Sequence, residues 1–273
     1  MMEGEIMINL NEILHRLIAE YIELDEIIGI TMSGSKVSNH QDDLSDINLD
    51  LYVREDLSIE KRRQIMLKFS NKMENNSYSA APSDYFLLDE FPIQMTVYYI
   101  DLILLKSELN RVLEEGVAKI GYTTRVAYNF LNANIVYDRF GELTKLQNQY
   151  EGYYPNHLKE NIISLNFPLL KSSISSYYHQ LQQAINRQDR IVIFAVVNKF
   201  LVSYFDVLFA LNKCYNPGEK RLVQIAKERC QYCPMDLEEN IDALLLHTAK
   251  GEPQLLEVIE QMIYDLQVPS INN

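Results

Sequence analysis

The stretch that decides the fold is residues 28–53, IGITMSGSKVSNHQDDLSDINLDLYV, which predicts two strands joined by a polar connection. The apolar run before the connection is rich in β-branched side chains, which favour a strand. Gly34 and Ser35 follow that run directly, and such a turn presents backbone N–H groups and a hydroxyl to an anion. We therefore expect Gly34 and Ser35 to bind a phosphate group. Lys36 is the cation placed to neutralise it, the alternative being a solvated lysine at a helix start.

Acidic and amide side chains alternate with apolar ones in the second strand, residues 46–51, Asp-Ile-Asn-Leu-Asp-Leu. Because side chains along a strand repeat every second residue, Asp46, Asn48 and Asp50 share one face. Carboxylates suit Mg²⁺, a hard cation that takes oxygen ligands from protein and phosphate together. We predict Asp46 and Asp50 as metal ligands, with Asn48 offering an uncharged amide oxygen. The structural alternatives are a turn-capping role for Asp46 and a solvent-facing position for Asp50.

These residues carry a resemblance to a known superfamily. Gly34 and Ser35, followed by Ser45, Asp46 and Asn48, are similar to the Gly-Ser … Ser-Asp-hydrophobic-acid signature of polymerase-β-like nucleotidyltransferases. Aminoglycoside and lincosamide nucleotidyltransferases share this minimal fold. Weaker matches in residues 135–141, 154–155 and 208–221 resemble a bacterial subfamily with a helical C-terminal domain.

The resemblance implies transfer of a nucleoside monophosphate from an NTP, most often ATP, to a hydroxyl of a small acceptor, with Mg²⁺ as cofactor. It further implies that a cation of the helical domain, Lys220 or Arg221, holds the triphosphate; an exposed basic turn is the alternative. Asp206 and Glu219 are the candidate general bases of that domain.

Two departures from the superfamily pattern bear on catalysis. The second metal-binding acid of the signature falls on Asn48, which brings no negative charge. The third acid usually comes from a later strand, and residues 92–99 offer Gln94, Thr96 and Tyr98 on that face instead. A catalytically degenerate nucleotide-binding regulator, or part of a toxin–antitoxin-like pair, is therefore the main alternative function. The third hypothesis for the function is a structural dimerisation module that binds no nucleotide.

The chain has 273 residues and a formal net charge of −13. A broad nucleic-acid surface needs clustered Lys and Arg, so this charge argues against one. It suits a small cationic acceptor, although acidity for solubility alone is the simpler explanation. The acidic start, MMEGEIMINLNEIL, is unlike a basic secretory signal, and no stretch has the length of an uninterrupted membrane span. We expect a cytoplasmic protein without a membrane partner, of undetermined oligomeric state.

The order of expected elements predicts an α+β fold with two domains. A helical pattern over residues 9–25 precedes the two strands, and further strands are expected at 85–88 and 93–100. Together they predict a small mixed-sheet domain over residues 1–101. Helical spacing then recurs between Gly and Pro breakers, which predicts an all-α helical bundle over residues 102–273.

A helix is also expected over residues 59–74, with Ser58 as its N-cap. Its first turn holds Lys61, Arg62 and Arg63. A basic trio at this position is typical of a solvated surface, so we predict that all three side chains face water.

The three cysteines, Cys214, Cys230 and Cys233, are too few for a disulfide framework and fit a reducing compartment. Cys230 and Cys233 form a lone CxxC pair. Without a second pair, the pattern argues against a zinc or redox function.

Overall fold

The computed structural model describes residues 2–33, 46–75, 82–90 and 93–271. It divides the chain into two compact units, Met1–Ser107 with Leu131–Glu151, and Glu108–Phe130 with Gly152–Asn273. This differs from a single boundary at residue 101. The reason is a strand, β6 (Asn134–Asp138), that pairs with the first strand of the chain and so returns its segment to the first unit.

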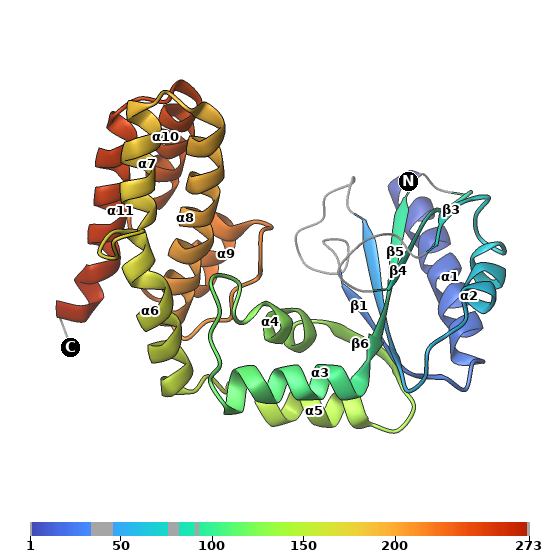
Figure 1. Cartoon of the computed structure of the whole chain (residues 1–273). Coiled ribbons are helices and arrows are strands. Elements are labelled where there is room, and N and C mark those ends of the chain that lie inside the picture. The colour runs from blue at the N-terminus through green and yellow to red at the C-terminus, as the bar shows by residue number, and fades with distance from the viewer. Residues whose placement is uncertain (1, 34–45, 76–81, 91–92, 272–273) are drawn as a thin grey trace. The chain divides into compact units, whose positions relative to one another are not determined.

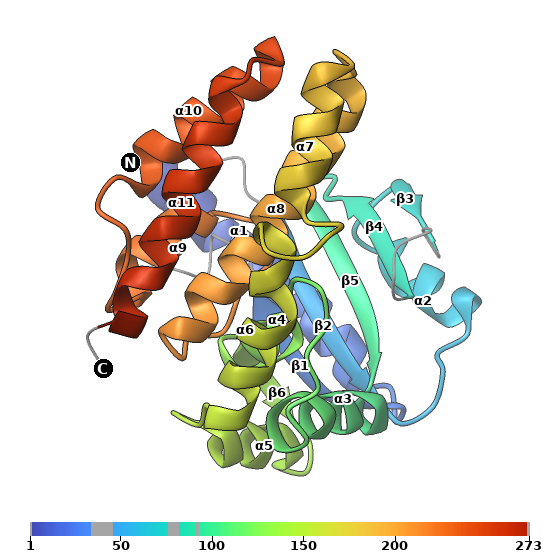
Figure 2. The ribbon, with the colours of Figure 1, turned by 60° about the vertical axis from the view of Figure 1, so that its left-hand side comes forward.

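The first unit is built on a six-stranded mixed sheet of order β3-β4-β5-β2-β1-β6 (Figures 1 and 2). Among these neighbours β2 and β5 run parallel, and the other adjacent pairs are antiparallel. The remaining elements are helices. In chain order the unit contains α1 (Met2–Ile22), β1 (Ile27–Ser33), β2 (Ile47–Val53), α2 (Ile59–Met66), β3 (Lys72–Glu74), β4 (Ser83–Leu87), β5 (Gln94–Asp101), most of α3 (Leu102–Leu109), β6 and α5 (Glu142–Tyr150). The α+β class and the mixed sheet are confirmed.

One face of this sheet carries the apolar core of the first unit. Leu17 and Tyr21 of α1 are fully buried in the same cluster as Leu49, Leu51 and Val97 of the central strands. Figure 1 shows α1 and α2 on the same side of the sheet. Burying these side chains stabilises the unit by roughly 1.5–3 kcal/mol each, so the covered face fixes which strand residues point away from it.

Helix α2 differs from the expected helix at its end and on one face. Ser58 caps it as predicted, accepting a hydrogen bond from the Lys61 amide at 3.3 Å. The helix ends at Met66, and Lys72–Glu74 pairs with β4 as a short edge strand. Arg62 is buried, so the prediction of a solvated basic turn is wrong for this residue.

The buried Arg62 faces the sheet. Its Nε lies 3.6 Å from Oδ2 of Asp84 on β4, and both side chains are almost wholly excluded from solvent. The guanidinium also lies 4.5 Å from the ring centroid of Tyr99 on β5. A buried charge needs a partner of opposite charge, and Asp84 supplies it from a strand that is distant in sequence.

The second unit is helical in the part of the chain that the structure describes, whereas the segment 131–151, predicted as part of an all-α bundle over residues 102–273, contains strand β6 and belongs to the first unit. The second unit begins within α3. Its further elements are the π-helical turn η1 (Asn110–Glu114), α4 (Arg125–Leu131), α6 (Asn156–Leu170), α7 (Tyr177–Asn186), α8 (Arg190–Leu211), α9 (Leu222–Arg229), α10 (Leu237–Lys250) and α11 (Gln254–Ile271).

Helix α8 is the centre of this unit. Its 22 residues are long and apolar enough to cross a membrane by length and composition alone, although Lys199 and Asp206 interrupt the apolar run. More than half of the most apolar window of this helix is buried inside the protein, and Phe200, Tyr204 and Phe209 lie in the core of the unit. Packing on this scale is typical of the core helix of a globular unit.

Candidate functional site

The candidate site lies on the polar face of β2, which runs between β1 and β5 (Figure 2). Burial alternates along this strand. Ile47, Leu49 and Leu51 are buried in the apolar core, whereas Asn48 and Asp50 are half-buried. The alternation predicted for this strand is therefore confirmed, and the apolar core on one side holds both polar side chains on the other.

Asn48 stands in a row of polar side chains that crosses three strands. It pairs with Ser33 of β1 on one side and with Thr96 of β5 on the other. Directly paired residues point to the same face of a sheet, so the three side chains are neighbours. Asp46 is half-buried and directly precedes β2, at the same end of the strand as this row. An amide, two hydroxyls and a carboxylate therefore meet at one end of the central strands.

Asp50 lies one strand repeat further along and takes part in a hydrogen-bonded chain. The Thr31 hydroxyl donates a long hydrogen bond of 3.5 Å to Oδ2 of Asp50. Its oxygen also lies within hydrogen-bond distance, 3.3 Å, of the hydroxyl of Tyr52. Burial raises the pKa of Asp50 to about 6, and the Thr31 hydrogen bond opposes the rise. Asp50 is thus a carboxyl group that changes charge near neutral pH.

Burial also governs the neighbouring phenol. It raises the pKa of Tyr52, and the negative charge of Asp50 adds to the effect. Tyr52 therefore stays protonated while Asp50 ionises, and its hydroxyl stays hydrogen-bonded to Thr31. This arrangement was not recognised from the sequence, although Tyr52 continues the two-residue period of Asn48 and Asp50.

The phosphate-binding residues predicted from the sequence, Gly34, Ser35 and Lys36, lie outside the described residues. The strand that leads to them is described: β1 ends at Ser33, which pairs with Asn48. Contacts of these three residues with a phosphate stay predictions.

The spacing of the two carboxylates limits how they can bind metal. Asp46 and Asp50 are four residues apart, and an extended chain rises about 3.3 Å per residue, so their Cα atoms are roughly 13 Å apart. Magnesium–oxygen bonds are about 2.1 Å long, so one ion cannot bind both acids. Each acid can share an ion with Asn48. Among the residues that the structure describes, no group of three or more His, Cys, Asp and Glu side chains could hold a metal ion.

The acid expected from a later strand is not on this face in the described part of the sheet. Thr96, buried beside Asn48, takes the position on β5. Asp84 on β4 pairs with Val97, whose side chain lies on the opposite, apolar face, and there it pairs with Arg62. A carboxylate held in that ion pair is not a ligand for a metal beside Asn48.

Asp206, one of the two predicted general bases, is a buried structural acid of the second unit. It accepts hydrogen bonds from the Thr123 hydroxyl at 2.8 Å and from the Thr123 amide, and a further one of 3.0 Å from the Asn216 side chain. Burial raises its pKa, and these hydrogen bonds oppose the rise. Asp206 thus links Thr123, which precedes α4, to Asn216, which precedes α9. Only about 1% of its surface is exposed, so a substrate hydroxyl cannot readily reach its carboxylate.

The other predicted residues of this unit are exposed. Glu219 and Lys220 lie in the turn between α8 and α9, followed by Arg221, which has a left-handed backbone conformation with φ of 55°. Contact of Lys220 with a triphosphate stays a prediction.

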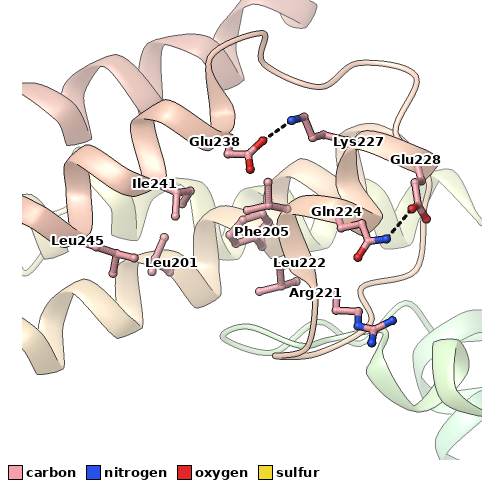
Figure 3. A pocket seen from close by; sticks show the side chains of 11 residues that line it. Leu201, Phe205, Arg221, Leu222, Gln224, Lys227, Glu228, Glu238, Ile241 and Leu245 are labelled. Atoms are coloured by element: carbon pink, nitrogen blue, oxygen red, sulfur yellow. Dashed lines mark hydrogen bonds and ion pairs between the residues drawn. The ribbon is translucent and has the colours of Figure 1, made fainter. Parts of the chain in front are cut away.

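A groove of about 650 Å³ lies in the second unit, bordered by α8, α9 and α10 (Figure 3). Leu201 and Phe205 of α8 line it, and the Lys227–Glu238 ion pair crosses its rim. Its lining is largely apolar and includes neither Asp206 nor Lys220. The groove therefore offers no oxygen cluster for a metal–phosphate complex.

The class defined by these observations is an α+β protein in which a mixed-sheet unit carries a polar central strand and a second unit is helical. A family model described as "Domain of unknown function (DUF4037)" matches residues 123–222. The matched segment includes β6 and α5 of the first unit and the Thr123–Asp206–Asn216 cluster of the second, and it does not include β2.

Comparison with solved structures finds a similarity to a nucleotidyltransferase-like protein from Exiguobacterium sibiricum. The two sequences are 14% identical, the alignment covers 93% of this chain and 72% of the other, and the TM-score is 0.44. Comparison with curated proteins finds no match. The identity and the TM-score are too low to assign a site or an activity, so the function has to be argued from the residues themselves.

Proposed function

We propose that the first unit is a nucleotidyltransferase domain that uses Mg²⁺ and an NTP, ATP in the first instance. It would transfer the nucleoside monophosphate to a hydroxyl of a small, preferably cationic acceptor and release pyrophosphate. The observation that supports this proposal is the polar face of β2, where Asn48 and Asp50 lie beside hydroxyl groups of β1 and β5 and Asp46 directly precedes the strand. Oxygen donors on a rigid central strand, beside the strand that leads in the chain to Gly34 and Ser35, are the parts that phosphoryl transfer needs.

The residues at the end of β2 have the chemistry to hold Mg²⁺. Asp46 and Asn48 would share the ion, whose remaining ligands would be phosphate oxygens and water. When bound, the ion stabilises negative charge on the leaving pyrophosphate.

The protein's own groups would position the reactants. Ser33 and Thr96 lie on either side of Asn48; Ser33 is half-buried and its hydroxyl would donate to a phosphate oxygen, whereas Thr96 is buried and would support Asn48 from the other side. Asp50 would accept the proton of the acceptor hydroxyl, because a carboxyl group with a pKa of about 6 is ionised at neutral pH yet more basic than an ordinary aspartate.

Pyrophosphate release tests the proposal. The full chain is incubated with Mg²⁺, labelled ATP and a panel of aminoglycosides, lincosamides and cell metabolites. Asp46→Asn should abolish Mg²⁺-dependent turnover without changing the circular dichroism spectrum, because it removes charge at constant volume. Asp56→Asn is the matched control, since Asp56 is exposed and lies beyond the end of β2. Equal turnover by wild type and Asp46→Asn would refute the catalytic role of Asp46.

A catalytically degenerate nucleotide-binding protein is the second candidate. Two observations favour it: Asn48 and Thr96 occupy positions where the resembled superfamily places acids, and Asp84 is committed to Arg62 on the other face. Calorimetry with ATP separates the candidates. Tight binding without pyrophosphate release under any acceptor condition would support the degenerate protein over the enzyme.

A further inference from the structure

Two cysteines of the second unit, distant in sequence, are held side by side. Cys214 follows α8, and Cys230 ends α9. Asn212 joins the two segments, because its side-chain amide donates to the carbonyl oxygen of Tyr232 at 2.8 Å and its oxygen accepts from the Tyr232 amide at 2.7 Å. The Cys214 thiol lies 3.3 Å from the carbonyl oxygen of Arg229, directly before Cys230.

The Cys214 thiol donates to the Arg229 carbonyl oxygen and also to the Asn212 carbonyl oxygen at 3.5 Å. The interaction between the two cysteines lowers the pKa of Cys214 and raises the pKa of Cys230. The positive charge of Arg229 also favours the Cys214 thiolate. Cys214 is half-buried, whereas Cys230 is 8% exposed. The Cys214 sulfur is therefore the more accessible of the two, and the Cys230 sulfur is the more protected.

We propose that Cys214 and Cys230 form a reversible disulfide, and that Cys214 is the thiol which a hydroperoxide oxidises first. The Cys214 thiolate attacks a peroxide oxygen, the O–O bond breaks, and the released alkoxide or hydroxide takes up a proton. Cys214 is then a sulfenic acid. The Cys230 sulfur attacks it, the S–O bond breaks, and the leaving hydroxide takes the Cys230 proton as water. In total, two thiols are oxidised to one disulfide and one hydroperoxide is reduced. The products of the reduction are one alcohol and one water molecule, or two water molecules when the oxidant is hydrogen peroxide.

Cys233 is the less suitable partner. Burial raises the pKa of Cys233 as it does that of Cys230, but the carbonyl group that the Cys214 thiol contacts, that of Arg229, is directly bonded to Cys230. The CxxC segment lies in the turn after α9 and not at a helix N-terminus, where such motifs gain thiolate character. The sequence pattern thus draws attention to Cys230 and Cys233, whereas the tertiary contacts pair Cys230 with Cys214. The disulfide would close a loop that contains α9 and the Glu219–Arg221 turn, which ties the end of α8 to the end of α9.

Peptide mapping of the full chain tests the pairing directly. Reduced protein is treated with one equivalent of hydrogen peroxide, its free thiols are blocked, and it is digested with trypsin without reductant. Cys214 falls in the peptide 214–220 and Cys230 in the peptide 230–250. We expect these peptides to be linked, with fragment ions placing the bond on Cys230, a loss of two of the three free thiols, and reversal by dithiothreitol.

Variants serve as controls. Cys233→Ser should keep the linked peptide, and Cys214→Ser should lose it. Because Cys230 packs in the core, Cys230→Ala can fail to fold. In that case the peptide map of the wild-type protein shows whether the bond is on Cys230. A bond within peptide 230–250, oxidation of single cysteines to sulfinic acid without a linked peptide, or three thiols remaining free would overturn the proposal.

Discussion

Replacing Asp50 with asparagine should make the protein more stable at neutral pH. Asp50 has an ordinary pKa of 3.8 in the unfolded chain and a pKa of about 6 in the folded protein, where burial penalises its charge. The folded state therefore holds the proton more tightly, and the free energy of unfolding falls as pH rises from about 3.8 through 6. Asparagine has nearly the same volume, keeps an acceptor for the Thr31 hydroxyl and carries no charge to penalise.

The size of the effect follows from the two pKa values. Each pKa unit corresponds to about 1.4 kcal/mol, so the ionised carboxylate costs about 3 kcal/mol above pH 7 and about 1 kcal/mol at pH 4.5. The stability gained by Asp50→Asn should therefore be about 2 kcal/mol larger at pH 7.5 than at pH 4.5. This is a large fraction of the stability of an ordinary domain.

Urea unfolding at the two pH values measures this difference. The chain has no Trp, so the transition is followed by far-ultraviolet circular dichroism. Glu55→Gln is the control for the change in net charge, because Glu55 is exposed in the same unit. If Asp50→Asn gains no more at pH 7.5 than at pH 4.5, or no more than Glu55→Gln does, the assignment of Asp50 as a half-buried carboxyl with a raised pKa is refuted.

Three further predictions concern the first unit. Arg62→Ala leaves Asp84 buried without its cation and should lower the free energy of unfolding by about 3–5 kcal/mol; a loss below 1 kcal/mol in urea unfolding would contradict a buried pair. Gly29→Ala places a Cβ 2.3 Å from Leu143 Cδ1 and should cost about 1–3 kcal/mol, and Leu143→Ala in the same chain should make that substitution tolerated; purely additive effects in the double-mutant cycle would argue against the contact. Asn48→Asp adds a carboxylate beside the proposed ion and should tighten Mg²⁺ binding roughly tenfold in calorimetry. Unchanged affinity would indicate that another group already supplies the charge.

Local sequence was sufficient where the physical cause is itself local. The two-residue period of a strand predicted which residues of β2 face the core and which form the polar row, and Leu49 and Asp50 lie accordingly. Ser58 was recognised as an N-cap because its bond to the Lys61 amide spans three residues. The helical spacing that predicted the second unit is likewise a repeat within single elements.

Tertiary structure decided the features that depend on residues far apart in the chain. β6 joins the first unit because its backbone groups pair with β1, and no periodicity in residues 134–138 encodes that partner. The local sequence around Arg62 is typical of a solvated helix turn, but in the folded protein Asp84 of β4 forms an ion pair with it. Burial, ion pairing and the contact of Cys214 with the backbone beside Cys230 are properties of a neighbourhood in space, so the charge states that they influence can be derived only from the fold.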